Sequence, residues 1–178
     1  MKRVVLHDKT FELSIPFSEI EKSITQISVK MDYDLKGKDI VMLCILNGSF
    51  MFAADLMKKL TVPCRVSFVK VTSYQGTGSV GTVKELIGLN EDLKGKTVVI
   101  LEDIIDTGRT IQQIIKTVEE KLPAEIKIAT MLFKPTACLY PVNIDYVGLE
   151  IPDDFMVGYG LDYDGFGRNL PDMYTLVK

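Results

Sequence analysis

Two apolar segments of strand length place the strongest constraint on how this chain folds. Ile40 to Leu46 and Val98 to Leu101 are continuous apolar runs, which is typical of strands buried on both faces. Through the middle of the chain, segments with helical spacing alternate with strand-like segments. This alternation predicts an α/β fold, in which helices cover both faces of a parallel sheet and ligands bind at the carboxyl ends of its strands.

Apolar spacing and breaker residues place the other elements. A capping box at Ser18 to Glu21 predicts a first helix that runs to about Tyr33. A second helix is expected from Phe50 to Leu60, and a third over Ile111 to Leu122, where Pro123 stops it. Further strands are expected at residues 65–72, 83–89, 126–133 and 144–150.

The chain shows no repeat, no low-complexity segment and no linker that would divide it. We therefore predict a single domain over residues 1–178, with a core at about 17–150. The tail from Pro152 to Lys178 is rich in glycine, aspartate and aromatic residues and has little helical periodicity. Residues 151–178, together with the N-terminal segment, are expected to form a small irregular hood over one edge of the sheet.

Composition argues against several classes of partner. A formal net charge of −3 and no basic cluster longer than Lys58-Lys59 argue against nucleic-acid binding. Cys44, Cys64 and Cys138 lie far apart, which favours reduced thiols in a cytoplasmic protein. The apolar run Val4 to Leu6 is too short for a signal peptide, and no run approaches the ~20 residues of a membrane span. We expect a cytoplasmic protein without nucleic-acid or membrane partners.

Three familiar signals do not predict their usual functions here. Residues 76–81 match G-x-G-x-x-G, but the segment 83–89 that follows is short, partly β-branched and strand-like, so a mobile glycine loop between two strands is favoured over a dinucleotide site. Gly95-Lys96-Thr97 precedes a strand, whereas a P-loop follows one, and is interpreted as a turn. His7 is the only histidine and lies near the start, so neither a histidine-based triad nor a zinc site is expected.

The segment from Val98 to Thr110 carries the strongest functional signal. A buried strand ends in two acids, a short loop follows, and a helix then begins. The amino end of a helix presents unpaired N–H groups and positive potential, which suit a phosphate. Gly108 lets the backbone approach that phosphate closely, and the hydroxyls of Thr107 and Thr110 add donors.

The acids of this segment suit a sugar next to the phosphate. Glu102 and Asp103 would accept hydrogen bonds from ribose hydroxyls, or hold magnesium with them. Asp106 lies between the sugar site and the phosphate loop, where it would face a reacting base. The plainer alternative is that Asp106 or Thr107 only caps the helix and that the two acids are solvated. The combination of these residues at one strand end favours a ligand site.

This segment resembles the signature that binds 5-phosphoribosyl-1-pyrophosphate (PRPP) in the type I phosphoribosyltransferases. Ser73-Tyr74, Lys134-Pro135 and Val147 to Asp162 resemble the hypoxanthine-guanine branch, which salvages purines. The resemblance extends from about Phe17 to Pro171. It implies a parallel-sheet transferase that joins hypoxanthine or guanine to PRPP, giving IMP or GMP and pyrophosphate, and that is a homodimer or homotetramer.

The resemblance also implies roles around the sugar phosphates. It assigns the PRPP phosphate and ribose to Glu102, Asp103, Asp106, Thr107, Gly108, Arg109 and Thr110. Leu46-Asn47-Gly48 is similar to the pyrophosphate loop, in which the family has a cis peptide after the leucine. Many relatives carry Lys or Arg at the position of Asn47, so pyrophosphate binding here would depend on backbone N–H groups. Arg168 would contact pyrophosphate, and Ser73-Tyr74 would begin a lid.

Further roles implied by the resemblance concern the base and the metal. Lys134 would donate to the 6-oxo group of the purine, Phe155 would stack on the ring, and the backbone of Met156 would bind its edge. Asp106 would take a proton from the base. Glu102 and Asp103 would provide ligands for Mg²⁺, and Asp162 would lie near a second Mg²⁺ and the base.

Two alternatives remain open from the sequence. One is a regulatory protein that uses this fold to sense PRPP and binds nucleic acid, which the acidic balance disfavours. The other is a transferase for another base, such as xanthine or a pyrimidine. Lys134 and Phe155 favour a 6-oxopurine but do not select among hypoxanthine, guanine and xanthine.

Overall fold

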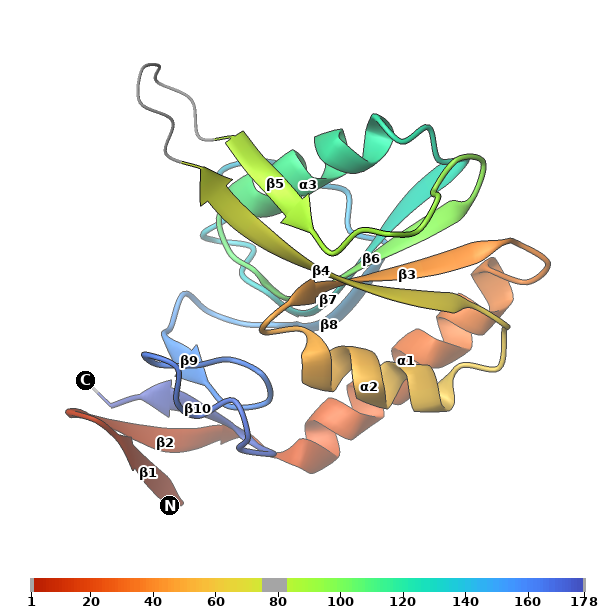
Figure 1. The fold of residues 1–178 in the computed structure, drawn as a ribbon. Helices are drawn as coiled ribbons and strands as arrows, with labels where there is room; N and C mark the ends of the chain where they lie inside the picture. Colours follow the sequence, from red (N-terminus) through yellow and green to blue (C-terminus); the bar gives the residue numbers. More distant parts are fainter. Residues whose placement is uncertain (1, 75–82, 178) are drawn as a thin grey trace.

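A computed structural model of the protein describes residues 2–74 and 83–177. The described residues form three helices and two sheets, with a larger core and a smaller hood in which both ends of the chain lie (Figure 1). The glycine loop expected at residues 76–81 lies outside the described residues.

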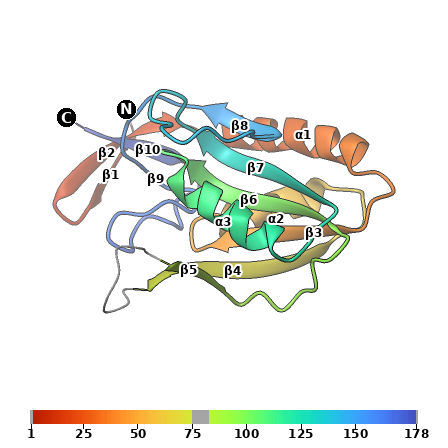
Figure 2. The same cartoon turned by 90° about the horizontal axis from the view of Figure 1, so that it is seen from above.

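The core is built on a six-stranded sheet with the order β5-β4-β3-β6-β7-β8, which Figure 2 shows from above. Its strands are β3 (Ile40–Leu46), β4 (Arg65–Tyr74), β5 (Val83–Ile87), β6 (Thr97–Ile105), β7 (Glu125–Phe133) and β8 (Tyr146–Glu150). Strands β4, β3, β6, β7 and β8 pair in parallel, and β5 joins β4 at the edge in an antiparallel pair. This pairing confirms the predicted parallel sheet. Its central strands carry apolar side chains on both faces, so neither face can be exposed to water.

Helices cover both faces of this sheet, as the sequence predicts (Figure 1). Helices α1 (Phe17–Asp34) and α2 (Phe50–Lys59) pack on one face, and α3 (Arg109–Glu119) packs on the other. Alternate β3 side chains serve the two layers: Met42 packs with α1 and α2, and Leu43 packs with α3. None of the helices in the described ranges is long and apolar enough to cross a membrane.

The start of α1 differs from the predicted capping box. The helix begins at Phe17, with extended Pro16 as its N-cap residue, so Ser18 lies inside the first turn and does not cap. The Phe17 N–H instead donates to Oδ1 of Asp172, 2.9 Å away. The capping-box prediction is wrong because a carboxylate from the far end of the chain takes the place of a local cap.

The end of α3 also differs from its prediction. The helix ends at Glu119, and Leu122 lies beyond it with φ of 55° and 65% of its surface exposed. The Leu122 carbonyl accepts a hydrogen bond from Gly95 N–H at 2.9 Å, in the turn that precedes β6. Apolar spacing alone extended the helix too far, because this backbone contact bends the chain before the periodic pattern stops.

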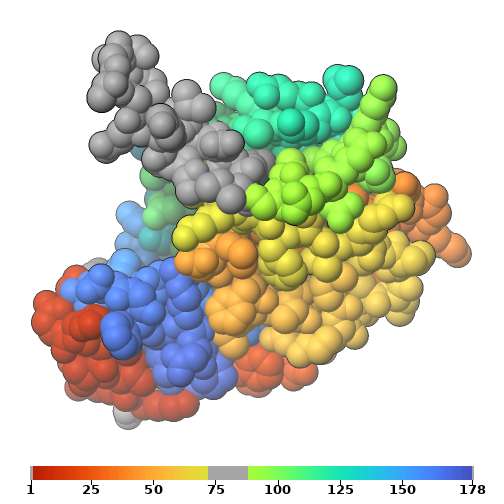
Figure 3. Space-filling model, viewed as in Figure 1, coloured from red at the N-terminus to blue at the C-terminus, as the bar shows by residue number. Residues whose placement is uncertain are grey.

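The hood is more regular than predicted. It contains a four-stranded antiparallel sheet with the order β1-β2-β10-β9. The strands are β1 (Arg3–Leu6), β2 (Lys9–Ile15), β9 (Met156–Val157) and β10 (Met173–Leu176). The N-terminal hairpin pairs with the C-terminal strand β10, and Figure 3 shows the two ends of the chain packed together. Local sequence could not predict this sheet, because its central pair, β2 and β10, joins segments more than a hundred residues apart and β9 has only two residues.

The cysteine residues are free thiols. Cys44 lies in the buried part of β3, and burial raises the pKa of its thiol to about 12. Such a thiol stays protonated and unreactive at neutral pH.

Asp172 joins the hood to α1, and its removal is expected to destabilise the protein. Its carboxylate accepts from Phe17 N–H and from Nζ of Lys2, the latter at 2.6 Å, and the Lys2 contact holds the pKa of Asp172 below its usual value. We expect Asp172→Ala to lower the free energy of unfolding at pH 7 by about 1–2 kcal/mol, as the loss of a helix cap does. Chemical denaturation at several pH values measures this effect.

The pH dependence of that loss follows from the lowered pKa of Asp172. The stabilisation is present above the ordinary pKa of an aspartate and disappears as the pH falls through the lower folded-state pKa. The difference in free energy of unfolding between the unmodified protein and Asp172→Ala should therefore become smaller in acid. Asp164→Asn is the control, because the Asp164 side chain is 84% exposed and asparagine, unlike alanine, readily adopts the φ of 49° at this position. Equal stability of Asp172→Ala and the unmodified protein at pH 7 would contradict the assigned cap.

Candidate active site

A cavity of about 330 Å³ opens at the carboxyl ends of β3 and β6. The predicted residues that line it are Leu46, Asn47, Gly48, Glu102, Asp103, Asp106, Thr107, Gly108, Thr110, Asp162 and Arg168. Apolar side chains complete the wall, namely Ile45, Val71, Ile104, Ile105 and Ile111. Sequence analysis assigned these apolar residues no role in the site, although most lie beside predicted polar ones at the end of the same strand.

The loop between β6 and α3 is held by hydrogen bonds from the segment that follows β7. The Thr107 carbonyl accepts hydrogen bonds from the N–H groups of Leu139 and Tyr140, at 3.1 and 3.0 Å. Gly108 has φ of 81°, and a Cβ atom at this position would overlap the carbonyl oxygen of Tyr140. Glycine is therefore required here by backbone conformation and by space. Arg109 begins α3 with its side chain exposed and is not among the lining residues of the cavity.

The loop after β3 meets the acids of β6 at very short range. The Leu46–Asn47 peptide bond is cis, which confirms what the resemblance implies. A Cβ atom on Gly48 would overlap Oδ2 of Asp103, so only glycine fits between the loop and this carboxylate. Asn47 is exposed and brings no charge to the loop.

The hood contributes one cation and one acid to the cavity. Nη2 of Arg168 lies 2.6 Å from Oδ1 of Asp162, and Nη1 donates to the Gly160 carbonyl at 2.6 Å. The other carboxylate oxygen of Asp162 accepts from Gly165 N–H at 2.7 Å. These contacts hold the guanidinium at the cavity wall with part of its charge already compensated.

The environment of Asp103 disfavours a negative charge. Burial raises the pKa of Asp103 to about 6, and Asp162 also raises it. The N–H of Ile104, which donates to Oδ1 at 2.9 Å, and the positive charge of Arg168 partly offset this effect. Glu102 is also buried, with 7% of its surface exposed. Within residues 2–74 and 83–177, no three acidic, histidine or cysteine side chains are grouped closely enough to form a ready-made metal site.

Lys134 lies at the mouth of the Asp106 loop between two carboxylates. Its ammonium nitrogen is 3.3 Å from Oδ2 of Asp106 and 3.0 Å from Oδ1 of Asp153. Burial acts to lower the pKa of Lys134, but the hydrogen bonds to Asp153 and Asp106 outweigh it and raise the pKa above its usual value. With 6% of its surface exposed, Lys134 is a buried cation and not a surface lysine.

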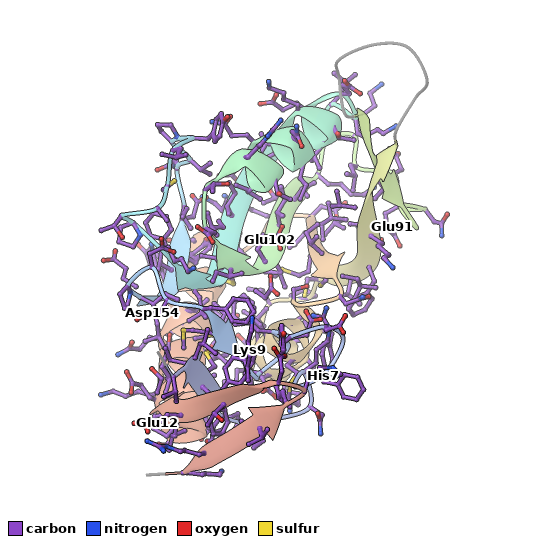
Figure 4. All side chains as sticks on the ribbon, turned by 90° about the vertical axis from the view of Figure 1, so that its left-hand side faces the viewer. His7, Lys9, Glu12, Glu91, Glu102 and Asp154 are labelled. Carbon is purple, nitrogen blue, oxygen red and sulfur yellow. The ribbon has the colours of Figure 1, made fainter. Side chains whose placement is uncertain are left out.

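Phe155 and Met156 lie outside the cavity wall. The ring of Phe155 is 44% exposed and packs about 6 Å from the rings of Phe11 and Tyr163, with Nζ of Lys9 5.7 Å from its centroid. Met156 is buried at the start of β9. In Figure 4, Lys9 stands on the hood side and Glu102 on the core side of this region.

The predicted lid residues Ser73 and Tyr74 end β4, and their side chains lie outside what the structure describes. Backbone pairing of Ser73 with Lys84, and of Tyr74 with Val83, links the end of β4 to β5.

Comparisons with known proteins identify the family of this chain. The phosphoribosyl transferase domain family matches residues 17–164. Hypoxanthine phosphoribosyltransferase of Salmonella typhimurium is 39% identical over 171 residues, which cover 94% of this chain and 96% of that protein. Hypoxanthine-guanine phosphoribosyltransferase of Staphylococcus aureus is 36% identical over 172 residues, covering 96% of both proteins.

Solved structures give the same result. The crystal structure of a hypoxanthine phosphoribosyltransferase from Staphylococcus aureus has a TM-score of 0.84 and 35% identity, covering 93% of this chain and 91% of that one. The Trypanosoma cruzi hypoxanthine phosphoribosyl transferase has a TM-score of 0.85 and 31% identity, covering 98% and 95%. The chain belongs to the phosphoribosyl transferase family. Within that family it falls in the hypoxanthine-guanine group of transferases, as the sequence motifs indicate.

The raised pKa of Asp103 predicts that this residue costs stability at neutral pH. Well below the ordinary pKa of an aspartate the carboxyl is neutral in both the folded and the unfolded protein. The cost builds up as the pH rises from about 4, where the unfolded chain ionises, to about 6, where the folded protein ionises. Asp103→Asn should therefore be more stable than the unmodified protein at about pH 8, by on the order of 1–3 kcal/mol. Denaturation in metal-free buffer measures the difference.

The same comparison in acid provides an internal control for Asp103. The two stabilities should converge below about pH 3, because the carboxyl of Asp103 is then neutral in both the folded and the unfolded protein. Asp164→Asn, on an exposed side chain, should show no such pH-dependent gain. An Asp103→Asn protein that is less stable at pH 8 would show that Asp103 is stabilised as an anion.

Proposed function

We propose that this chain transfers the phosphoribosyl group of PRPP to hypoxanthine or guanine, giving IMP or GMP and pyrophosphate. The observation that carries this proposal is the buried ammonium of Lys134 beside Asp106, at the edge of a cavity made by the phosphate loop. An ammonium is a donor for a 6-oxo group, and a neighbouring carboxylate can accept the proton that the purine loses. The relatives named above, which are hypoxanthine or hypoxanthine-guanine phosphoribosyltransferases, support the same substrates.

PRPP would lie along the cavity with its 5-phosphate at the start of α3. There Thr107 to Thr110 provide hydroxyls and the first N–H groups of the helix, which attract an anion. The ribose hydroxyls would face Glu102 and Asp103. The pyrophosphate would lie between Gly48 and Arg168, where backbone N–H groups and a guanidinium replace the charge that Asn47 lacks.

Mg²⁺ is the cofactor that these oxygen donors fit best. Glu102 and Asp103 would hold one ion and Asp162 would lie near a second, each completed by water and by oxygens of PRPP, because magnesium keeps several waters and usually takes one or two protein carboxylates. A cation at this place would supply positive charge next to the leaving pyrophosphate. The lack of a ready-made three-ligand group among the described residues is consistent with an ion that binds together with its substrate.

The reaction would exchange one bond at the anomeric carbon for another. A purine ring nitrogen forms the new bond as the bond to the pyrophosphate oxygen breaks, and the sugar gains oxocarbenium character. Asp106, which lines the cavity and is half-exposed, takes the proton from the purine nitrogen or stabilises the positive sugar. Arg168 stabilises the charge of the pyrophosphate. A lid that begins at Ser73-Tyr74 would exclude water from PRPP.

The base would lie between the cavity and the hood. Lys134 would donate to the 6-oxo oxygen, the half-exposed ring of Phe155 would stack on the purine, and the Met156 backbone would bind its edge. Asp162, which lines the cavity from the hood, would lie near the same base.

The protein would act in the cytoplasm as a homodimer or homotetramer. Val66 and Phe68 are two residues apart and therefore lie on the same face of β4, where they are 40% and 46% exposed. An apolar surface of this kind is one that a second copy of the chain would cover. The free thiols are consistent with a reducing compartment.

Asp106→Asn tests the proton acceptor. The variant should still bind PRPP, because the amide keeps the shape of the loop, but turnover should fall roughly 10²–10⁴-fold when the proton acceptor is lost. Steady-state kinetics with hypoxanthine measure turnover, and calorimetry with PRPP serves as the control for binding. Near-normal turnover would remove Asp106 from the proton transfer.

The proposed magnesium requirement is tested by removing divalent ions. Activity should disappear in excess chelator and return when Mg²⁺ is added above the chelator concentration, because the acids of the cavity offer oxygen ligands. Full activity in excess chelator would contradict the metal proposal.

Lys134→Met tests the choice of base. The 6-amino group of adenine presents donors to a buried donor, so the unmodified protein should prefer hypoxanthine or guanine by at least about tenfold in kcat/KM. The Met variant should lose most of this preference, because its kcat/KM for the 6-oxopurines should fall. Kinetics with hypoxanthine, guanine, xanthine and adenine on both proteins measure the effect, and equal use of adenine by the unmodified protein would contradict the assignment.

A further inference from the structure

Three neighbouring strands place Asp106, Lys134 and Asp153 in a row. Strands β6, β7 and β8 are adjacent and parallel, and each of these residues follows the carboxyl end of one of them. Backbone hydrogen bonds fix the spacing, because Lys134 N–H donates to Ile105 O at 3.0 Å and Ile151 N–H donates to Phe133 O at 2.9 Å. The lysine therefore lies between an acid that lines the cavity and an acid that does not.

The proposed function requires Asp106 to accept a proton and Lys134 to bind the purine. These two requirements conflict if Asp106 is the only carboxylate that pairs with Lys134. Asp106 must be available to accept a proton, yet an oxygen that binds the Lys134 ammonium is less available for that purpose. Lys134 must also turn to the 6-oxo oxygen of the purine, which is neutral. A buried ammonium that exchanges a carboxylate for a carbonyl loses most of its charge compensation, and buried charges without a partner are strongly disfavoured.

Asp153 resolves this conflict through its position. Its Oδ1 lies closer to the Lys134 ammonium than Asp106 does, at 3.0 against 3.3 Å, and it approaches from the β8 side, away from the cavity. An ammonium has three hydrogens, so one can stay on Asp153 while another moves to the base.

We infer that Asp153 is a positioning residue for purine binding: it retains Lys134 as a compensated cation while Lys134 leaves Asp106 for the 6-oxo group. This inference rests on the proposed function and deepens it. Asp106 is then released as a proton acceptor only when a base that can accept from Lys134 has bound, so base recognition and proton transfer are linked through one lysine.

Asp153 is a suitable residue to test, because its side chain is 65% exposed and its replacement removes little packing. In Asp153→Asn, Lys134 should stay on Asp106, and KM for hypoxanthine should rise about tenfold with a lower kcat, which corresponds to the loss of a charge-assisted hydrogen bond. KM for PRPP should stay within about twofold, because the phosphate loop does not contact Asp153. Asp153→Glu, which keeps the charge at an exposed position, should recover most of the hypoxanthine KM.

Asp164→Asn is the matched control, with the same change of charge on an exposed hood side chain. Calorimetry with IMP adds a readout that does not depend on turnover, and the IMP Kd should rise in Asp153→Asn but not in Asp164→Asn. A hypoxanthine KM and an IMP Kd equal to those of the control would overturn the inference, as would equal increases of KM for hypoxanthine and PRPP. If the unmodified protein does not use hypoxanthine or guanine, the proposed function itself fails, which is distinct from an active enzyme with an unaffected variant.

Discussion

The parallel pairing of β3 with β6 is the constraint on which the rest of the structure depends. Val41 to Cys44 pair in register with Val98 to Leu101, and all of these side chains are fully buried. Because the two strands are parallel, their carboxyl ends meet at the same edge, and the loop that follows β3 contacts an acid near the end of β6. The requirement for glycine at position 48, where any side chain would overlap Asp103, is a direct result of that meeting.

Charge compensation before the substrate arrives is the second general property of the site. Arg168 is held by Asp162, and Lys134 is held by Asp106 and Asp153, each from a different strand end or from the hood. Neither cation is left unpaired in a partly buried place, which would be costly. PRPP and the purine would therefore replace existing ion pairs when they bind. Selectivity would depend on which of these ion pairs each ligand can replace.

The hood shows where local sequence patterns lose their information. Its sheet joins Lys9–Ile15 to Met173–Leu176, and the same connection brings Asp172 to the start of α1. Neither partner segment carries a local sign of the other. Ser18 matched a capping box by spacing alone, and it failed because Asp172, a residue distant in sequence, binds the first N–H of the helix more directly.

The sequence by itself determined the elements and residues that depend on neighbours along the chain. The apolar runs identified β3 and the first part of β6, which continues beyond Leu101 to Ile105. The run from Glu102 to Thr110 identified the acids, glycine and hydroxyls that line the cavity, because strand, turn and helix start are local properties. The resemblance of the chain to the phosphoribosyltransferases also indicated the cis peptide bond after Leu46.

Only the tertiary structure decided the environment of the side chains. It buried Lys134 between two acids, raised the pKa of Asp103 through burial, and placed Phe155 and Met156 outside the cavity wall. Burial and charge pairing are set by segments that are far apart in the chain and meet only on folding. For this reason the sequence could name Lys134, but its partner Asp153 became visible only when β7 and β8 were placed side by side.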